Sequence, residues 1–274
     1  MKKIGALLFF MLTAFFPASA QDTLTIQDTS KFELLTSILT DADFFTTDNQ
    51  SNIYTVKANI LSKFDKTGKL LYKYSNKNYG NITFVDVSNM LKILVFYRNY
   101  LLCIFLDNTL SVNGNPISFD NIGFLQAQLI CSSHNNGLWI YDQQNLELVR
   151  IDQNLQRTQQ TGNLSALLGI NLHPDYLIEY DNKVYLNNPE TGILVFDIYG
   201  TYYKTIPAKN VKQFQPFGEL VYYHTGNEIK AYNLKTLEEI RFEIPYTEFK
   251  NFRLEMGVLV LQTSEYIRLF APGK

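Results

Sequence analysis

Apolar residues along this chain gather in short, nearly continuous runs rather than alternating with polar residues. Examples are the runs Lys92–Tyr97 and Val258–Leu261. Strands of this kind are typical of sheets covered on both faces, whereas strands with one solvated face alternate apolar and polar positions. Helical spacing of apolar residues occurs only briefly, at 30–35, where Ser30 and Glu33 could form a capping box and predict a short helix. The pattern predicts an all-β protein.

The strand patterns recur in a weak repeat of about forty residues. Each copy contains a short strand, a turn, a second strand that ends in an acidic residue, another turn and a further strand. The clearest copies are Asn52–Val56 with Ile60–Leu71, Gly137–Tyr141 with Leu146–Asp152, and Asn182–Leu186 with Ile193–Gly200. A repeat of this length made of short strands is typical of a β-propeller and not of a helical solenoid.

Six units fit the chain, and together they predict a six-bladed β-propeller with four-stranded antiparallel blades. The innermost strands are expected near 42–46, 82–87, 127–132, 175–180, 211–217 and 249–254. Outer strands are expected near 69–74, 109–112, 155–158, 202–206 and 238–244. The sixth unit lacks an outer strand, so we expect an N-terminal strand, Thr23–Gln27, to complete the last blade and close the ring.

The segment from Asp48 to Leu70 resembles one blade of the six-bladed NHL/TolB-like propeller superfamily, and Asn182–Tyr203 resembles it more weakly. The chain does not have the repeated Trp-Asp pairs of WD40 propellers or the double glycines of kelch propellers. The resemblance implies a disc with a central channel, and ligands or partners bound at one face. Members of the superfamily include scaffolds, receptor-like binders and a minority of metal-dependent hydrolases.

The first 20 residues have the layout of a secretory signal peptide. Lys2 and Lys3 precede the apolar run Ile4–Phe16, and Ala18-Ser19-Ala20 matches a cleavage site. The run is shorter than the roughly 20 residues that span a bilayer, and Gln21 is not the cysteine of a lipoprotein. We therefore expect residues 21–274 to form a single exported propeller domain, periplasmic or secreted or peripheral to the outer membrane, with no transmembrane segment.

Composition and charge limit the classes of partner. The 20 Phe and 18 Tyr suit packed strands, and the formal net charge of -2 argues against binding nucleic acid through its phosphates. The two cysteines, Cys103 and Cys131, lie in apolar runs and are expected to be buried thiols. A protein partner is expected, and a small-molecule ligand remains an alternative.

Candidate site residues come from topology because no catalytic motif occurs in the sequence. In a propeller blade, the entrance to the first strand and the turn between the second and third strands lie on one face. This places one set of polar residues on the same face around the channel mouth, while His134 lies opposite: His173, Asp175, His224, Lys57, Asn59, Arg98, Asn99, Asp142, Asn187, Asn188 and Glu190. The candidate ligand-binding residues are His173, Asp175, His224, Arg98 and Lys57.

Two interpretations of this set remain open. His173 and Asp175 could anchor a ligand, hold a divalent metal or transfer a proton. Alternatively, they are ordinary turn and loop residues, and no cofactor is needed. The recurring acids Asp65, Asp152 and Asp197 are interpreted as turn formers, because their side chains can accept hydrogen bonds from nearby backbone amides.

These observations favour a non-catalytic propeller that presents one face to a protein partner or an envelope assembly. The first alternative is a periplasmic or secreted metal-dependent hydrolase or lyase with its site at the channel mouth. The second is a binder of an extracellular sugar or peptide.

Overall fold

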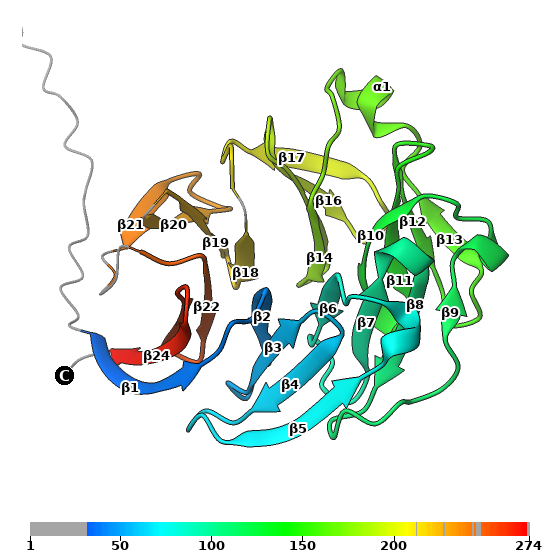
Figure 1. Ribbon diagram of the computed structural model, residues 1–274. Coiled ribbons are helices and arrows are strands. Elements are labelled where there is room, and N and C mark those ends of the chain that lie inside the picture. The colour runs from blue at the N-terminus through cyan, green and yellow to red at the C-terminus, as the bar shows by residue number, and fades with distance from the viewer. Residues whose placement is uncertain (1–31, 212, 227, 243, 245–247, 273–274) are drawn as a thin grey trace, which may run out of the picture.

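The computed structural model describes residues 32–272 except 212, 227, 243 and 245–247. These residues form six four-stranded antiparallel sheets, which stand as blades around a central axis (Figure 1). The predicted six-bladed β-propeller is confirmed.

The strands of the first three blades, from the innermost outwards, are β2 (Phe44–Thr47), β3 (Ile53–Lys57), β4 (Ile60–Phe64) and β5 (Leu70–Ser75); β6 (Phe84–Asp86), β7 (Ile93–Tyr97), β8 (Leu102–Leu106) and β9 (Ile117–Ser118); and β10 (Ala127–Ser132), β11 (Leu138–Asp142), β12 (Glu147–Ile151) and β13 (Arg157–Gln160). The fourth and fifth blades are β14 (Tyr176–Tyr180), β15 (Lys183–Asn188), β16 (Gly192–Asp197) and β17 (Tyr202–Ile206); and β18 (Phe214–Phe217), β19 (Leu220–Thr225), β20 (Glu228–Asn233) and β21 (Glu239–Phe242). The sixth blade contains β22 (Asn251–Glu255), β23 (Val258–Gln262), β24 (Tyr266–Pro272) and β1 (Phe32–Leu39).

An N-terminal strand closes the last blade, as expected, but it is formed by different residues. β1 pairs antiparallel with β24 from Phe32 opposite Pro272 to Leu39 opposite Tyr266. The short helix expected at 30–35 is wrong from Phe32 onwards, because these residues belong to the strand. Pairing with the open edge of β24 outweighs a weak local helix signal. The predicted closing strand Thr23–Gln27 lies outside the described residues.

Blade-to-blade packing explains the continuous apolar runs. Six clusters of buried side chains occupy the six spaces between neighbouring blades. In β7 all five residues are buried, and alternate residues pack against opposite neighbours: Val95 toward the first blade and Phe96 toward the third. Both faces of a blade are therefore apolar, which removes the alternation that a half-exposed strand shows.

The recurring acids at the strand ends form turns, as predicted. Asp65, Asp152 and Asp197 each accept hydrogen bonds at Oδ1 from the backbone N–H groups two and four residues later. Asp107 does the same, and Asn233 Oδ1 accepts hydrogen bonds from the backbone N–H groups two and three residues later. These side chains are occupied by the turns that they stabilise.

The outer strand of the second blade is not at 109–112, and that expectation is wrong. Val112 forms only an isolated bridge with Leu106, and the paired strand is β9, where Ile117 lies opposite Cys103. The intervening Asn113-Gly114-Asn115-Pro116 interrupts the strand, because Gly114 adopts a positive φ and proline lacks the N–H that a ladder needs.

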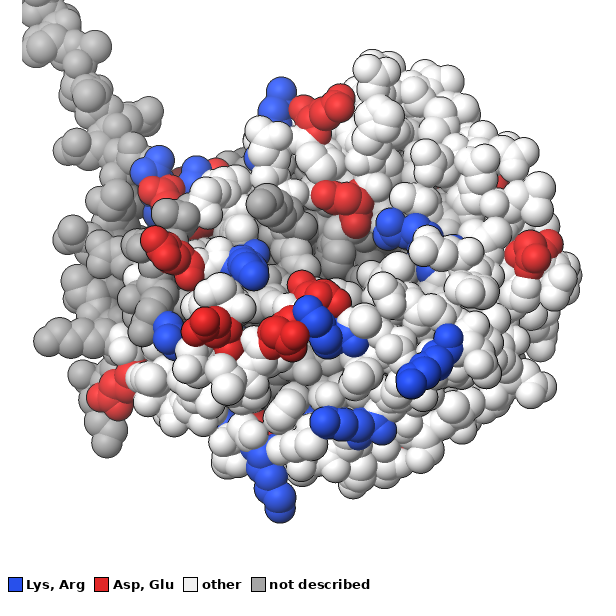
Figure 2. All heavy atoms as spheres, viewed as in Figure 1, with Lys and Arg blue, Asp and Glu red and all other residues white. Residues whose placement is uncertain are grey.

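Short helices occupy some connections of the described chain: η1 (Lys77–Tyr79), η2 (Arg98–Tyr100), η3 (Asp120–Ile122), η4 (His134–Asn136) and α1 (Leu164–Leu168). None of the described helices has the length and apolar character that crossing a membrane requires. On the face seen in Figure 2, acidic and basic side chains are interspersed around the hollowed centre of the disc, without one extended basic surface.

Candidate functional site

Two cavities lie along the centre of the disc. One has a volume of about 180 Å³ and is lined by residues at the entrances of the inner strands, together with Arg98 at the end of β7. The other, of about 310 Å³, is lined by the far ends of the inner strands. Because Phe84, Tyr176 and Arg253 line both, the cavities meet at these residues. We name the first the entry cavity and the second the opposite cavity.

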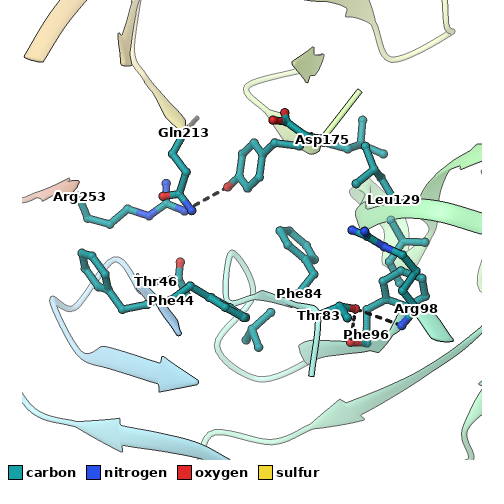
Figure 3. Close-up of a pocket in the computed structure, with 15 residues that line it drawn as sticks. Phe44, Thr46, Thr83, Phe84, Phe96, Arg98, Leu129, Asp175, Gln213 and Arg253 are labelled. Carbon is teal, nitrogen blue, oxygen red and sulfur yellow. Dashed lines mark hydrogen bonds between the residues drawn. The ribbon is translucent and has the colours of Figure 1, made fainter. Parts of the chain in front are cut away.

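Arg98 enters the entry cavity from the second blade (Figure 3). Its backbone N–H donates to the Thr83 hydroxyl at 3.0 Å, and this hydroxyl donates in turn to the Phe96 carbonyl at 3.0 Å. These bonds fix the start of η2. The Arg98 Nε is buried without a hydrogen-bond partner, and no described acid lies within ion-pair distance of the side chain. Burial lowers the pKa of Arg98.

Arg253 points into the channel from β22, on the opposite side from Arg98 (Figure 3). It is only 6% exposed, and its Nη2 donates to the Tyr176 hydroxyl at 3.1 Å. Edge-to-face contacts with Phe84 (5.8 Å) and Phe214 (5.1 Å) hold the Tyr176 ring in turn. The Arg253 Nε also has no hydrogen-bond partner in the described structure.

Asp175 is the acid of the entry cavity. Asn187 orients it: the Asn187 Nδ2 donates to Asp175 Oδ1 at 2.7 Å and to the Val211 carbonyl at 2.7 Å. Asp175 is exposed at the cavity mouth; partial desolvation by its surroundings raises its pKa, and the hydrogen bond from Asn187 opposes this effect. Among the described residues, two arginines and one aspartate give the ionised lining of this cavity a formal charge of +1.

The structure brings together two of the five residues selected from the sequence. Arg98 and Asp175 line the same cavity. His173 is exposed near Asp175, and only its backbone N–H has a described bond, to Asn188 Oδ1. His224 is buried between the fifth and sixth blades, with its ring 4.9 Å from that of Phe249. Lys57 forms surface ion pairs with Asp43 at 3.0 Å and Asp41 at 3.5 Å.

The acids of the opposite cavity serve the fold. Asp48 accepts four hydrogen bonds, one of them from the Tyr54 hydroxyl at 2.9 Å. Asp86 accepts from Ser132 N–H of the neighbouring blade at 2.8 Å. Glu255 accepts from the Thr47 hydroxyl at 2.9 Å and from Gln215 Nε2 at 3.0 Å, and burial raises its pKa.

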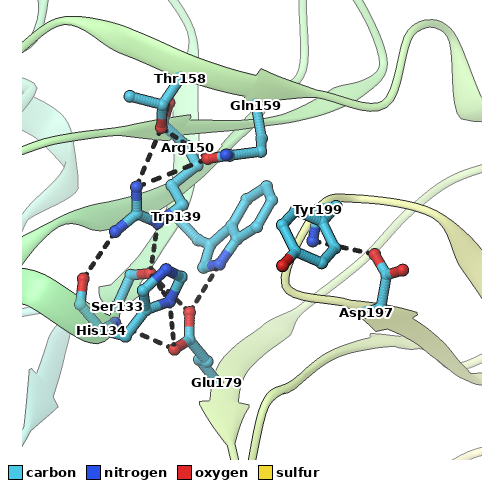
Figure 4. Close-up of polar contacts among 9 residues, drawn as sticks. All are labelled: Ser133, His134, Trp139, Arg150, Thr158, Gln159, Glu179, Asp197 and Tyr199. Atoms are coloured by element: carbon cyan, nitrogen blue, oxygen red, sulfur yellow. Dashed lines mark hydrogen bonds and ion pairs between the residues drawn. The ribbon is translucent and has the colours of Figure 1, made fainter.

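A polar network around Glu179 joins the third and fourth blades (Figure 4). Glu179 accepts hydrogen bonds from Trp139 Nε1 at 2.7 Å, from His134 N–H at 2.9 Å and from the Ser133 hydroxyl. Arg150 completes the network through Ser133 Oγ at 2.8 Å and the His134 carbonyl at 2.6 Å. Because its donors and acceptors largely satisfy one another, we interpret it as a structural connection.

Arg253 and Tyr176 were missed by the sequence analysis. The signal for Arg253 is a single charge between apolar neighbours, Phe252-Arg253-Leu254, in an innermost strand. Phe252 and Leu254 face the fifth blade, so alternation turns Arg253 to the other face of its blade, where a charge needs access to the channel or a polar partner. Among the described residues, no three His, Cys, Asp or Glu side chains are placed to hold a metal ion. Cys103 and Cys131 are buried free thiols, as predicted, and burial raises the pKa of each.

Comparisons with known proteins match the fold alone. No protein-family model matches the sequence, and no curated protein matches it. Virginiamycin B lyase from Staphylococcus aureus, solved as an inactive variant with quinupristin, is 12% identical and superposes with a TM-score of 0.63 over 88% of this chain and 99% of its own. The Pan2 WD40 domain of Neurospora crassa gives a TM-score of 0.65 at 8% identity, covering 91% of this chain and 98% of its own.

A third propeller, the N-terminal part of BBS1 in complex with ARL6, gives a TM-score of 0.55 at 11% identity, covering 85% of this chain and 78% of its own. This chain is a six-bladed β-propeller. Its neighbours in structure include a lyase and a domain solved with a protein partner, and identities this low do not transfer either activity.

Proposed function

We propose that this chain is an exported, non-catalytic binding protein that receives a protein partner at the entry cavity of the propeller. The observation that carries the proposal is the pair of arginines in the channel, Arg98 and Arg253, whose Nε–H groups are buried without a partner in the described structure. A buried charged donor is costly to leave unpaired. A partner that supplies acceptors would remove this cost on binding.

The lining of the entry cavity supports binding over catalysis. In the described structure the lining combines aromatic rings and guanidinium donors, and neither serine, cysteine nor histidine contributes to it. Apolar walls with a few convergent polar groups are typical of recognition pockets. The BBS1 propeller, solved with ARL6, supports the idea that a fold of this kind can present a face to a protein.

The proposed location outside the cytoplasm is supported by residues 1–20, with their basic start, apolar run and small-residue cleavage site. A partner would then be another envelope or secreted protein. A fusion of residues 1–20 to a reporter that is active only after export tests this part directly, and a reporter that stays in the cytoplasm would contradict it.

A face-specific capture experiment tests the binding function. The purified mature chain is incubated with envelope extract, and captured proteins are identified by mass spectrometry and then tested in purified form. Glu190 is exposed in the turn between β15 and β16, on the same face as Arg98. Lys66 is exposed in a turn on the other face and supplies the control.

We expect Glu190→Arg to weaken capture of the partner, because it places a bulky side chain of opposite charge on the binding face. Lys66→Glu, also a charge reversal, should leave capture unchanged. The proposal is contradicted if no protein is enriched above the control, or if the Lys66 variant alone loses the partner.

A metal-dependent hydrolase or lyase is the second candidate, favoured by the likeness to virginiamycin B lyase and by the carboxylate of Asp175 in the cavity. Metal analysis of the purified protein separates the two. A stoichiometric divalent ion lost on Asp175→Asn would favour the enzyme. Absence of a bound ion, together with unchanged partner capture in the presence of a chelator, would favour the binding protein.

A further inference from the structure

We propose that Arg98 and Arg253 together bind a carboxylate that is attached to an apolar or aromatic group, seated in the entry cavity. This inference rests on the proposed function, since it names the chemical group that the cavity receives. Both guanidinium groups point into the channel from opposite sides, and the cavity between them is lined by apolar and polar side chains together (Figure 3).

The first argument is the positive charge of the two arginines, which has no described ion-pair partner where the two cavities meet. Arg253 is more than nine-tenths buried, and its one described side-chain hydrogen bond goes to a neutral hydroxyl, that of Tyr176. The Arg98 side chain has no described hydrogen bond at all. The nearby Glu255 lines the opposite cavity, and its described bonds go to Thr47 and Gln215. Neither guanidinium forms a described ion pair, although Glu255 lies close enough to Arg253 for their opposite charges to attract.

The second argument concerns the charge of the ligand. Among the described residues, the ionised lining of the entry cavity has a formal charge of +1, because Asp175 offsets one of the two arginines. A monoanion neutralises this lining, whereas a dianionic phosphate would leave an excess negative charge beside Asp175. The planar fork of a guanidinium also matches the two oxygens of a carboxylate.

The third argument is the shape and wall of the cavity. Phe44, Phe84 and Tyr176 contribute aromatic surface, and Leu129 adds an aliphatic side. The volume of about 180 Å³ exceeds the roughly 150 Å³ of an apolar protein cavity that accepts benzene. A ligand of this class would place a ring or an aliphatic group against the wall and its carboxylate toward the arginines.

The chemistry has two sources, a small free carboxylate and the C-terminus of a peptide. Binding is measured by calorimetry on the mature protein with two matched pairs of probes. The first pair is phenylacetate and phenylacetamide. The second is the tripeptide Ala-Ala-Phe as its free acid and as its C-terminal amide. Within each pair only the charge of the terminal group changes.

We expect an acid to bind at least about tenfold more tightly than its amide, because hydrogen bonds to a charged group contribute more than those to a neutral one. Arg98→Gln and Arg253→Gln should each remove most of this preference. Arg157→Gln is the matched control: Arg157 lies over the ring of Phe124, outside the entry cavity, and its variant should keep the preference. Melting curves of every variant establish that it is folded, and Arg98→Gln suffices if Arg253→Gln does not fold.

Acid-selective binding of phenylacetate alone supports a small carboxylate, and acid-selective binding of the tripeptide supports a peptide C-terminus. Equal binding of acid and amide, no binding of any probe, or an equal loss in Arg157→Gln overturns the inference. No acid-selective probe binding, together with unchanged capture by the Arg98→Gln and Arg253→Gln variants, would overturn this inference and leave a protein-binding face that does not use the arginines. Acid-selective binding of a probe without any captured protein would support this inference and contradict the proposed function.

Discussion

The aspartates that recur at the strand ends stabilise turns, and this structural role explains their repetition without a role in catalysis. Asp152 holds its turn through bonds of 2.8 Å and 2.9 Å from the N–H groups of Asn154 and Gln156. Leu155 of this turn has a φ of 64°, which an L residue adopts only when the surroundings fix it. The carboxylate is one of the groups that fix it.

We therefore predict that Asp152→Ala lowers the free energy of unfolding by about 1–2 kcal/mol, because two backbone donors lose their acceptor. For a domain of this size the melting temperature should fall by about 2–8 °C. Gln153→Ala is the control, since Gln153 is exposed in the same turn and its side chain makes none of the turn's described bonds. Equal melting temperatures for the two variants would contradict the turn role.

Glu255 gives a prediction about pH. Burial raises its pKa above the ordinary value of 4.5 and Asp48 adds to the rise, against the lowering effects of the hydrogen bonds from Thr47 and Gln215 and of the charge of Arg253. The folded state therefore binds a proton more tightly than the unfolded state, and the contribution of Glu255 to stability falls as pH rises from about 4.5 through the raised pKa. Urea unfolding of wild type and Glu255→Gln across this range should show the difference in stability shifting in favour of the variant. A constant difference would contradict the raised pKa.

At the scale of elements, the closing strand β1 fixes the register of the last blade. Ile38 is 6% exposed and packs with Phe45 and Ile267, whereas the next residue, Leu39, is 73% exposed. A shift of one position would reverse these roles, because alternate residues of a strand face opposite sides.

We predict that Ile38→Ala destabilises the protein by about 2–4 kcal/mol through the cavity that it leaves. Leu39→Ala should change stability by no more than about 0.5 kcal/mol. Chemical denaturation of both variants measures this. A larger effect at Leu39 than at Ile38 would show that β1 pairs with β24 in a different register.

The elements also show what the sequence could and could not predict. The inner strands β10 and β14 were placed within a residue of their bounds, because apolar runs flanked by turn residues leave few alternatives. The strand at 32–39 was interpreted in part as a helix, since its partner β24 lies more than 200 residues away and local spacing carries no signal of it. The outer strand β9 was misplaced for a similar reason: its register depends on a four-residue interruption whose path the sequence does not specify.

At the scale of the whole molecule, closure of the ring brings residues from different blades into one cavity. Topology alone placed Arg98 and Asp175 on one face, and the structure places both in one cavity. The same reasoning could not separate these two from Lys57 or His224. A residue at the end of a second strand can turn toward the channel, toward solvent or toward the next blade, and side-chain packing decides which.

The aromatic residues also divide at this scale. Most are packing material between blades, as in Trp139, Phe96 and Phe214. Phe84 and Tyr176 differ because they line both channel cavities, where they contact each other and, through the Tyr176 hydroxyl, Arg253. At the centre of the ring, these aromatic side chains therefore lie beside an arginine that has no described ion pair.

A crystal structure of the mature protein grown with a saturating concentration of the free-acid tripeptide Ala-Ala-Phe or of phenylacetate is the most direct test of the central claim. The account predicts ligand density in the entry cavity, with carboxylate oxygens within hydrogen-bond distance of the Arg98 and Arg253 guanidinium groups and the ring against Phe84 or Tyr176. An empty cavity, or ligand bound only outside the channel, would contradict it.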